Sequence, residues 1–219
     1  MTEYLLRKYT KKMNKFILAS ASPRRKELLA QIGIEFDICV SNADESTDET
    51  IPALLVEQLS LKKAEGVKVS PALQADTADA IIKPVVIIGA DTIVACDDKI
   101  LGKPADKENA REMITLIQGR THQVYTGVTL IRVSDKVETI TFHEKTDVYV
   151  CPMQEDDIER YMEYKTSNNQ FEWADKAGAY AIQGYFARFV SGIDGDYNNV
   201  VGLPVGRLYQ EMKKAGWIL

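Results

Sequence analysis

The alternation of apolar and polar residues in the first third of the chain predicts strands and helices in turn. Residues 15–19 form a short apolar run typical of a strand. Apolar residues then recur at helical spacing over 28–32, and Gly33 ends this helix. Residues 35–41 predict a second strand, and residues 51–67 predict a longer helix.

The middle of the chain contains its most apolar stretch, residues 84–96. This stretch is rich in β-branched residues, so it predicts a strand that is buried on both faces and lies centrally in a sheet. The polar, Ala-rich segment before it, residues 70–84, predicts a loop or insertion. Apolar positions within 110–117 form one stripe of a helix that Asp106 caps and Gly119 ends.

The second half of the chain adds consecutive strands. Residues 121–133 and 137–150 alternate around a short polar turn and predict a hairpin. Residues 155–164 predict a short helix, and Pro204 opens a final helix through residue 214. Because strands and helices alternate early and a hairpin follows, we expect an α/β fold with a mixed sheet.

Composition narrows the class of protein. The chain has 219 residues, is 45% hydrophobic and carries a formal net charge of −5, which is ordinary for a globular protein and argues against a free-standing nucleic-acid binder. We expect one domain over residues 1–219, with a basic extension at 1–14. Cys39, Cys96 and Cys151 lack metal-site spacing and are expected to be buried, reduced thiols. Neither a signal peptide nor a membrane span is recognisable, so we expect a cytoplasmic protein without a membrane partner.

The first candidate for chemistry is the segment 20–25, SASPRR. Its small residues, with Ser22 as the expected cap and Pro23 at the first helical position, expose backbone N–H groups at a helix N-terminus. Arg24 and Arg25 in the first turn oppose the helix macrodipole, but a bound polyphosphate would reverse the sign of that effect. The alternative is a capped surface helix whose arginines point into water.

The second candidate is Asp91, followed by Thr92, in the middle of the apolar strand. A carboxylate there is costly to bury unless it is paired or coordinated, so Asp91 could be a metal ligand or general base. The alternative is an Asp that caps a bend. Lys63 and Lys103 could supply cations, and the pair at 44–45 (Asp-Glu) could supply oxygen ligands. By default, each lysine is a solvated side chain and the acidic pair is part of a loop.

The third candidate is the segment 177–184, AGAYAIQG. Small residues permit close approach to a flat ligand, and Gln183 offers a donor and an acceptor to a base edge. The alternative is a glycine-rich hairpin. His122 and His143 show no metal-ligand spacing, and no nucleophile for covalent catalysis is apparent.

Six segments in this order resemble the Maf (septum formation) nucleoside triphosphate pyrophosphatases: SASPRRKELL, GADTIV, LGKP, GRTHQVYTG, AGAYAIQG and GDYNNVVGLP. The resemblance covers about residues 16–214. It implies a Maf/inosine-triphosphatase-like fold, in which helices flank an elongated twisted mixed sheet and a cleft separates two lobes. It also implies metal-dependent hydrolysis of a nucleoside triphosphate to the monophosphate and diphosphate, which keeps unwanted nucleotides out of nucleic acids.

The resemblance also implies roles for individual residues. Asp91 would be the proton acceptor, and Glu45 with Asp91 would bind Mg²⁺ or Mn²⁺. The positions that match the family's phosphate-facing residues are Ser22, Arg24, Arg25, Lys63 and Lys103. Arg24, Thr92 and Gln183 match the specificity positions of the subgroup that acts on dTTP and UTP, and a homodimer is a family-level expectation.

The sequence also departs from the family pattern. The basic extension, the insertion near 70–84 and the loop at 167–172 are longer than expected, and residues 185–188 are bulkier, which affects the base pocket more than the chemistry. Two alternatives remain: an enzyme with broader preference for modified nucleotides or ITP, and a division-regulating nucleotide-binding protein with little turnover.

Overall fold

The strands of the computed structural model form one mixed sheet, within the residues that the structure describes, 14–68 and 84–218. The order along the sheet is β2-β1-β3-β5-β6-β7, and β4 pairs with β3 alone. The pairs of β1 with β2 and with β3 are parallel, and the remaining pairs are antiparallel. The strands are β1 (Lys15–Leu18), β2 (Phe36–Ile38), β3 (Val85–Cys96), β4 (Lys99–Leu101), β5 (Thr121–Val133), β6 (Val137–Val150) and β7 (Val190–Asp194).

The predicted central strand is confirmed by its neighbours and its burial. β3 lies between β1 and β5, and its side chains enter hydrophobic clusters on both faces of the sheet. Val86 and Ile88 belong to the large cluster, whereas Val85 and Ile87 belong to the cluster that includes Ala64. Burial on both faces explains the continuous apolar run, because neither alternating set of side chains faces water.

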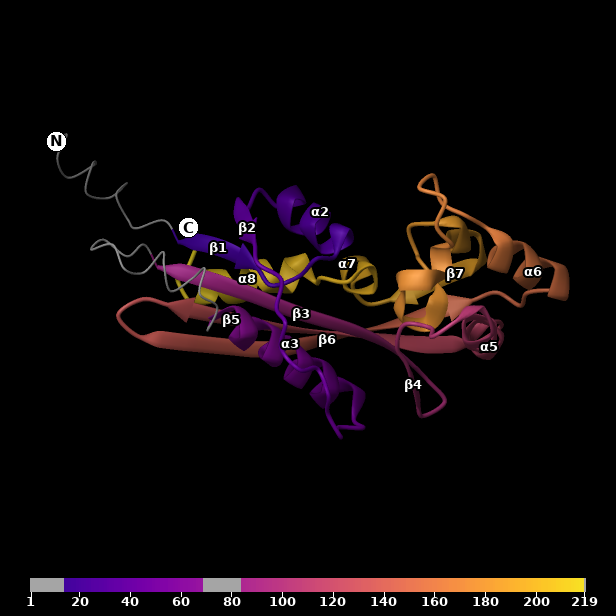
Figure 1. Ribbon diagram of the computed structural model, residues 1–219, viewed down its shortest axis with the longest axis horizontal. Helices are drawn as coiled ribbons and strands as arrows, with labels where there is room; N and C mark the ends of the chain where they lie inside the picture. The colour runs from indigo at the N-terminus through magenta and orange to yellow at the C-terminus, as the bar shows by residue number, and fades with distance from the viewer. Residues whose placement is uncertain (1–13, 69–83, 219) are drawn as a thin grey trace.

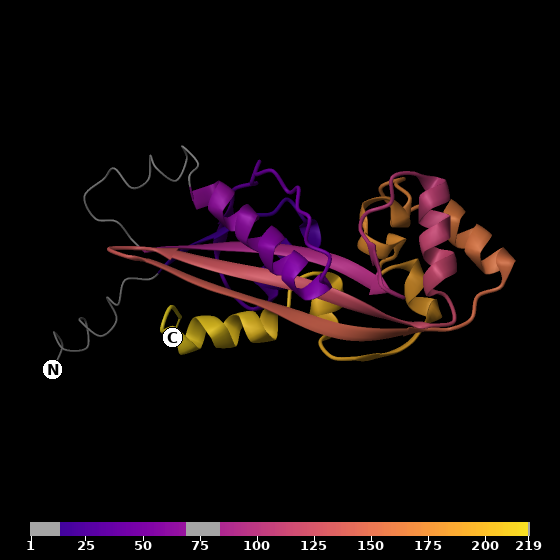
Figure 2. The same cartoon turned by 90° about the horizontal axis from the view of Figure 1, so that it is seen from below.

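Helices cover both faces of this sheet (Figure 1, Figure 2). The α-helices of the described residues are α2 (Pro23–Gln31), α3 (Pro52–Lys68), α5 (Lys107–Ile117), α6 (Glu155–Glu163), α7 (Tyr197–Val201) and α8 (Val205–Lys214). α3 lies on the face opposite α8 in Figure 2. Two glycines bring α3 close to the sheet: a β-carbon on Gly89 would lie 2.3 Å from the carbonyl oxygen of Ser60, and one on Gly127 would lie 2.1 Å from that of Val56.

A second lobe lies at the end of the long β5–β6 hairpin that is opposite its turn (Figure 1). It contains α5, α6, β7 and three short 3₁₀ helices: η1 (Glu172–Asp175), η2 (Ala177–Ala179) and η3 (Tyr185–Phe189). The expected two-lobed architecture with a twisted mixed sheet is therefore confirmed.

Most sequence predictions of secondary structure are confirmed, with corrections at the second strand and the short helices. The hairpin and the helices at 51–67, 155–164 and 204–214 are present within a residue or two. The second strand covers only Phe36–Ile38, and the pattern did not reveal α7 or the 3₁₀ helices.

Cys96 is buried as expected, but Cys39 and Cys151 are only partly buried; none of the three forms a disulfide.

Two predicted segments lie outside the described residues: nearly all of the basic extension at 1–14, and the insertion at 70–84 except for Pro84. Within the described part of the chain, no helix is long and apolar enough to cross a membrane.

Candidate active site

A cavity of about 690 Å³ lies between the two lobes, bounded by α2 and β3 on one side and by the η1–η2 segment on the other. The structure brings all the candidate site residues from the sequence except Asp44 into its lining: Ser22, Arg24, Arg25, Glu45, Lys63, Asp91, Thr92, Lys103 and Gln183. These residues come from positions more than 160 apart in the chain. The cavity is the cleft that the family resemblance implied.

The N-terminus of α2 opens into this cavity. Pro23 is the first residue of the helix and Ser22 is its N-cap, as predicted, but the Ser22 side chain makes no capping hydrogen bond. The Ser22 N–H instead donates to the hydroxyl of Ser20 at 3.2 Å. The first turn contains no acidic residue. A helix start of this kind favours an anion, because its free N–H groups and its dipole both face the ligand.

Asp91 lies on β3 and is paired with a cation, which explains how a carboxylate is tolerated in this strand. The ammonium group of Lys63, on α3, donates a hydrogen bond to Asp91 Oδ1 and lies 3.1 Å from Glu45 Oε2. The side chains of Lys63 and Asp91 are 14% and 13% exposed. The carboxylates of Asp91 and Glu45 are thus held together at one wall of the cavity by a shared lysine.

Asp44, the neighbour of Glu45, does not belong to this group. Its carboxylate accepts hydrogen bonds from the Ser46 N–H at 2.9 Å and the Ser46 hydroxyl at 2.6 Å. These bonds lower the pKa of Asp44 and close a local turn. The loop interpretation of the sequence is therefore correct for Asp44, while Glu45 faces the cavity.

Arg24 and Arg25 use their guanidinium groups differently. Arg25 donates to the Gly202 carbonyl at 2.9 Å, to the Thr92 hydroxyl at 3.0 Å and to the Ser20 hydroxyl at 3.2 Å. Burial lowers the pKa of Arg25, and the charge of Asp91 opposes that effect. Three of its five N–H groups therefore bind the protein itself, which the sequence pattern did not predict.

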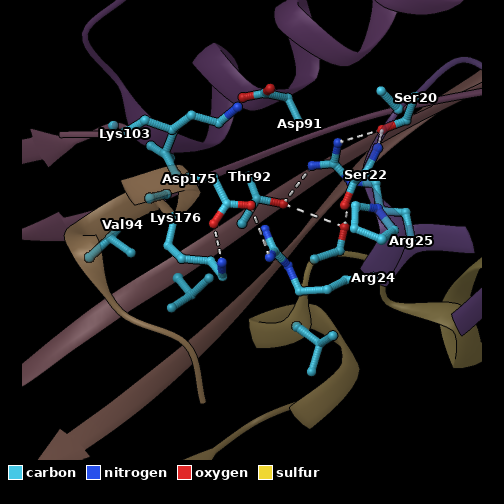
Figure 3. A pocket seen from close by; sticks show the side chains of 18 of the residues that line it. Ser20, Ser22, Arg24, Arg25, Asp91, Thr92, Val94, Lys103, Asp175 and Lys176 are labelled. Carbon is cyan, nitrogen blue, oxygen red and sulfur yellow. Dashed lines mark hydrogen bonds and ion pairs between the residues drawn. The ribbon is translucent and has the colours of Figure 1, made fainter. Parts of the chain in front are cut away.

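Two charged residues of the cavity were missed by the sequence analysis, Asp175 and Lys176. Arg24 reaches across the cleft to Asp175 at 3.5 Å, and Lys176 donates a hydrogen bond to the same carboxylate (Figure 3). Partial burial alone would raise the pKa of Asp175, but the hydrogen bond and charge of Lys176 and Arg24 lower it. Their position directly before the AGAYAIQG segment was the available signal.

Lys103 lies in the turn after β4 and also lines the cavity. The carbonyl of the preceding residue, Gly102, accepts a hydrogen bond from Gly178 N–H at 3.0 Å, which ties this turn to η2. The lysine is therefore presented by a turn that is anchored to η2 in the second lobe.

The AGAYAIQG segment folds into η2 and a following turn, so the glycine-rich hairpin alternative is wrong. Its glycines approach other side chains of the protein: a β-carbon on Gly178 would lie 2.8 Å from Val94 Cγ2, and one on Gly184 would lie 2.0 Å from Glu172 Oε2. These contacts show that the two glycines make room for Val94 and Glu172 of the protein itself, whereas we expected them to make room for a flat ligand. Gln183 is exposed and lines the cavity.

Glu172 is a buried carboxylate behind Gln183 that sequence analysis did not identify. It is 3% exposed and accepts hydrogen bonds from the N–H groups of Tyr185 at 2.8 Å and Phe186 at 3.1 Å. These amides begin η3, directly after the Gln183-Gly184 turn. Glu172 thus caps η3 and fixes the turn from which Gln183 projects.

Neither histidine lines the cavity. His122 is buried and shares a 2.8 Å hydrogen bond with the hydroxyl of Tyr180, whose ring borders the cavity. His143 pairs with Glu57 on the surface of α3. Among the described residues, no group of three or more His, Cys, Asp or Glu side chains could hold a metal ion.

Comparison with known proteins identifies the family. Residues 15–215 match the family model described as Maf-like protein. A protein named dTTP/UTP pyrophosphatase from Agathobacter rectalis is 47% identical, over 93% of this chain and 98% of its own. Proteins with the same name from Lachnoclostridium phytofermentans and Bacillus cytotoxicus are 48% and 45% identical, over 93% and 92% of this chain and 96% of each relative.

Solved structures of HAM1 proteins from Coxiella burnetii and Staphylococcus aureus align with TM-scores of 0.46 and 0.45 at 10% and 12% identity. Each alignment covers 92% of this chain and the whole of the other, and the likeness is too distant to bear on the site. The family model and the close relatives, which span nearly the whole chain, show that the chain belongs to the Maf-like protein family.

Proposed function

We propose that this protein is a nucleoside triphosphate pyrophosphatase that hydrolyses dTTP and UTP to the nucleoside monophosphate and diphosphate. The observation that carries the proposal is the cluster of Asp91, Lys63 and Glu45 in the same cavity as the N-terminus of α2. A general base suits the activation of a water molecule, and an anion-binding helix start suits the binding of a polyphosphate. The names of the relatives support the choice of substrate.

The charges that line the cavity suit a polyphosphate. Among the described residues, the cations in the lining are Arg24, Arg25, Lys63, Lys103 and Lys176, and the carboxylates are Glu45, Asp91 and Asp175. The excess is positive although the chain as a whole is acidic. Ser22 and the cations would bind the triphosphate and orient it.

Asp91 would act on the attacking water. It accepts a proton from the water as the water oxygen forms a bond to the α-phosphorus, and the bond from that phosphorus to the oxygen bridging to the β-phosphorus breaks. The bridging oxygen keeps the electron pair and leaves with the diphosphate. Lys63 fixes the orientation of the Asp91 carboxylate through its hydrogen bond to Oδ1.

The donor set fits a divalent cation, Mg²⁺ or Mn²⁺, held by Glu45 and Asp91. Magnesium sites commonly use one or two carboxylates together with substrate phosphates and water, so two carboxylates facing a cavity are sufficient. The bound cation would neutralise charge on the phosphates as the diphosphate leaves.

Gln183 would read the base. Its exposed amide offers one acceptor and a donor group, which matches the alternating donors and acceptors of a uracil or thymine edge. The turn that carries it is fixed by Glu172 from behind. Arg24, which reaches across the cleft to Asp175, matches another specificity position of the family and would contribute to the choice of base.

The test is diphosphate release from a panel of canonical and modified triphosphates, including ITP, with Mg²⁺ or Mn²⁺. Wild-type protein is expected to prefer dTTP and UTP, and Asp91→Asn to lose turnover while remaining folded. Asp98→Asn is a matched control, because Asp98 is exposed outside the cavity and its positive φ suits Asn. Full activity of Asp91→Asn contradicts the assignment, and no release from any nucleotide favours the division-regulating binding protein.

The cellular setting is part of the same proposal. A cytoplasmic homodimer that removes nucleotides before they are incorporated into nucleic acids would need neither a membrane nor a nucleic-acid partner. Light scattering of the purified protein measures the oligomeric state directly, and a monomeric mass would reject the homodimer without affecting the proposed reaction.

A further inference from the structure

Gln183 stands on a tight turn that joins the core to the cavity. The Ala181 carbonyl accepts a hydrogen bond from the Gly184 N–H at 3.1 Å, which closes the turn over residues 181–184. Ile182, inside this turn, is 9% exposed and packs in the large hydrophobic cluster. Gln183 is exposed and lines the cavity. The turn therefore places one side chain in the core and the next one in the cavity.

The Glu172 carboxylate packs against this turn and against the start of η3. Its Oε2 accepts from the Tyr185 N–H at 2.8 Å, and its Oε1 accepts from the Phe186 N–H at 3.1 Å. A β-carbon on Gly184 would lie 2.0 Å from Oε2, so the carboxylate fills the space beside the residue that follows Gln183. Glu172 does not line the cavity, so any effect that it has on a ligand passes through the turn.

Glu172 is itself held in place by its neighbours. It is the first residue of η1, and the rings of Phe171 and Trp173 on either side of it stack with centroids 5.1 Å apart. The Trp173 indole N–H donates to the Met162 carbonyl of α6 at 3.0 Å. A buried carboxylate is costly unless it is hydrogen-bonded, and here both of its oxygens are used. An anchored carboxylate of this kind restricts where the turn can lie.

The place of Gln183 matters because two bases offer it the same hydrogen-bonding pattern. Uracil presents N3–H beside its O4 carbonyl, and hypoxanthine, the base of ITP, presents N1–H beside its O6 carbonyl. One Gln amide can bond to either pair, with its oxygen as acceptor and its NH₂ group as donor. In hypoxanthine the pair lies farther from the ribose, because a purine has a second ring. The hydrogen-bonding pattern cannot separate UTP from ITP, whereas the distance of Gln183 from the phosphate side of the cavity can.

We propose that Glu172 is a positioning residue for base recognition: by fixing the 181–184 turn, it holds Gln183 where a pyrimidine meets it and the larger purine does not fit. The inference rests on the proposed function, in which Gln183 reads the base. It assigns the selection of pyrimidine over purine triphosphates to a buried carboxylate that does not touch the substrate, acting as the support that a precisely placed binding group needs.

Glu172→Gln tests the inference, because it keeps the size of the side chain and replaces one accepting oxygen by an NH₂ group that cannot accept from an amide. We expect the ratio of kcat/KM for UTP over ITP to fall about tenfold, mainly through a higher KM for UTP. Binding of inorganic triphosphate, which has no base, should stay within about twofold of wild type. Glu163→Gln is the matched control, since Glu163 is exposed at the end of α6 and outside the cavity; it should leave both quantities unchanged.

A double-mutant cycle with Gln183→Ala separates positioning from a general structural role. If Glu172 acts through Gln183, Glu172→Gln should lower the ratio of UTP to ITP in wild type but change it by less than about twofold in the Gln183→Ala background. An equal fall in both backgrounds, or an unchanged ratio in the single variant, would show that the inference is wrong. Circular dichroism checks the fold of each variant.

Gly184→Ala answers the same question if Glu172→Gln does not fold. Its β-carbon would displace the carboxylate from the side of the turn while the charge is retained, so the ratio of UTP to ITP should again fall. A folded Gly184→Ala with the wild-type ratio contradicts the inference, as does failure of both variants to fold, which would give Glu172 a role in folding alone. If wild type hydrolyses no nucleotide, the proposed function fails. The dissociation constants of UTP and ITP, measured by calorimetry on the same variants, then decide the role of Glu172.

Discussion

Lys63 on α3 donates a hydrogen bond to Asp91 on β3, and the side chains of both residues are nearly enclosed. The close approach of α3 to β3 makes this bond possible, because Gly89, two residues before Asp91, has no β-carbon to hold the helix away. The packing of α3 against the sheet therefore determines whether Lys63 can reach Asp91, the candidate general base.

Lys63→Gln should therefore reduce both turnover and stability. Gln can still donate a hydrogen bond but brings no charge to the Asp91 carboxylate, so we expect kcat to fall about 100-fold or more. The free energy of unfolding should fall by about 1–3 kcal/mol. Steady-state kinetics and urea unfolding measure the two effects. Lys62→Gln is the control, since Lys62 neighbours it on α3 but does not line the cavity; equal losses in both variants would contradict a specific role for Lys63.

Asp175→Asn should tighten binding of phosphates. The substitution removes a negative charge from the cavity and weakens the hold on Arg24 and Lys176. We expect inorganic triphosphate to bind about threefold more tightly at low salt, with the gain reduced at high salt because the carboxylate is partly exposed. Isothermal titration calorimetry gives the dissociation constants.

Asp37→Asn provides the comparison for that measurement. It removes the same charge from β2, where Asp37 pairs with Lys15 outside the cavity lining. Weaker binding by Asp175→Asn would mean that Asp175 orders the two cations for the ligand and does not compete with it.

Gly184→Ala should destabilise the protein. The added β-carbon would stand 2.0 Å from Glu172 Oε2, so the buried carboxylate must move and lose its bonds to the amides of η3. We expect a loss of about 1–3 kcal/mol, the usual range for a forced fit in a packed core. Gly206→Ala is the matched control, because nothing lies within 4 Å of its β-carbon in α8; it should leave stability unchanged or raise it by up to about 1 kcal/mol. Thermal unfolding that ranks the two variants in the reverse order would contradict the packing argument.

His122 should make stability depend on pH. Its burial lowers its pKa from 6.5 to about 4, so between these values the unfolded chain binds a proton that the folded chain does not. Stability then falls as pH decreases from 6.5 to about 4, by about 3 kcal/mol in total, and levels below that. Urea unfolding across this range in wild type and in His122→Gln measures the contribution. A slope that is the same in both proteins would show that other groups cause it.

Local patterns in the sequence determined most of the secondary structure. They also determined the side of the site that is formed by α2 and β3. The β-branched run around Asp91 defined the buried central strand, and the small residues before Arg24 defined a helix start suited to anions. These features depend on periodicity, capping and the cost of burying charge, which act over a few residues and can be read from the chain alone.

The tertiary structure decided how the candidate residues are used. Arg24 and Arg25 are adjacent in sequence, but one reaches across the cleft to Asp175 and the other is bound by Ser20, Thr92 and Gly202. Glu172 and Gly184 fit together although twelve positions separate them. Such relationships depend on which acceptor lies within 3 Å of a given donor, and that is set by the packing of segments distant in the chain, which no local pattern encodes.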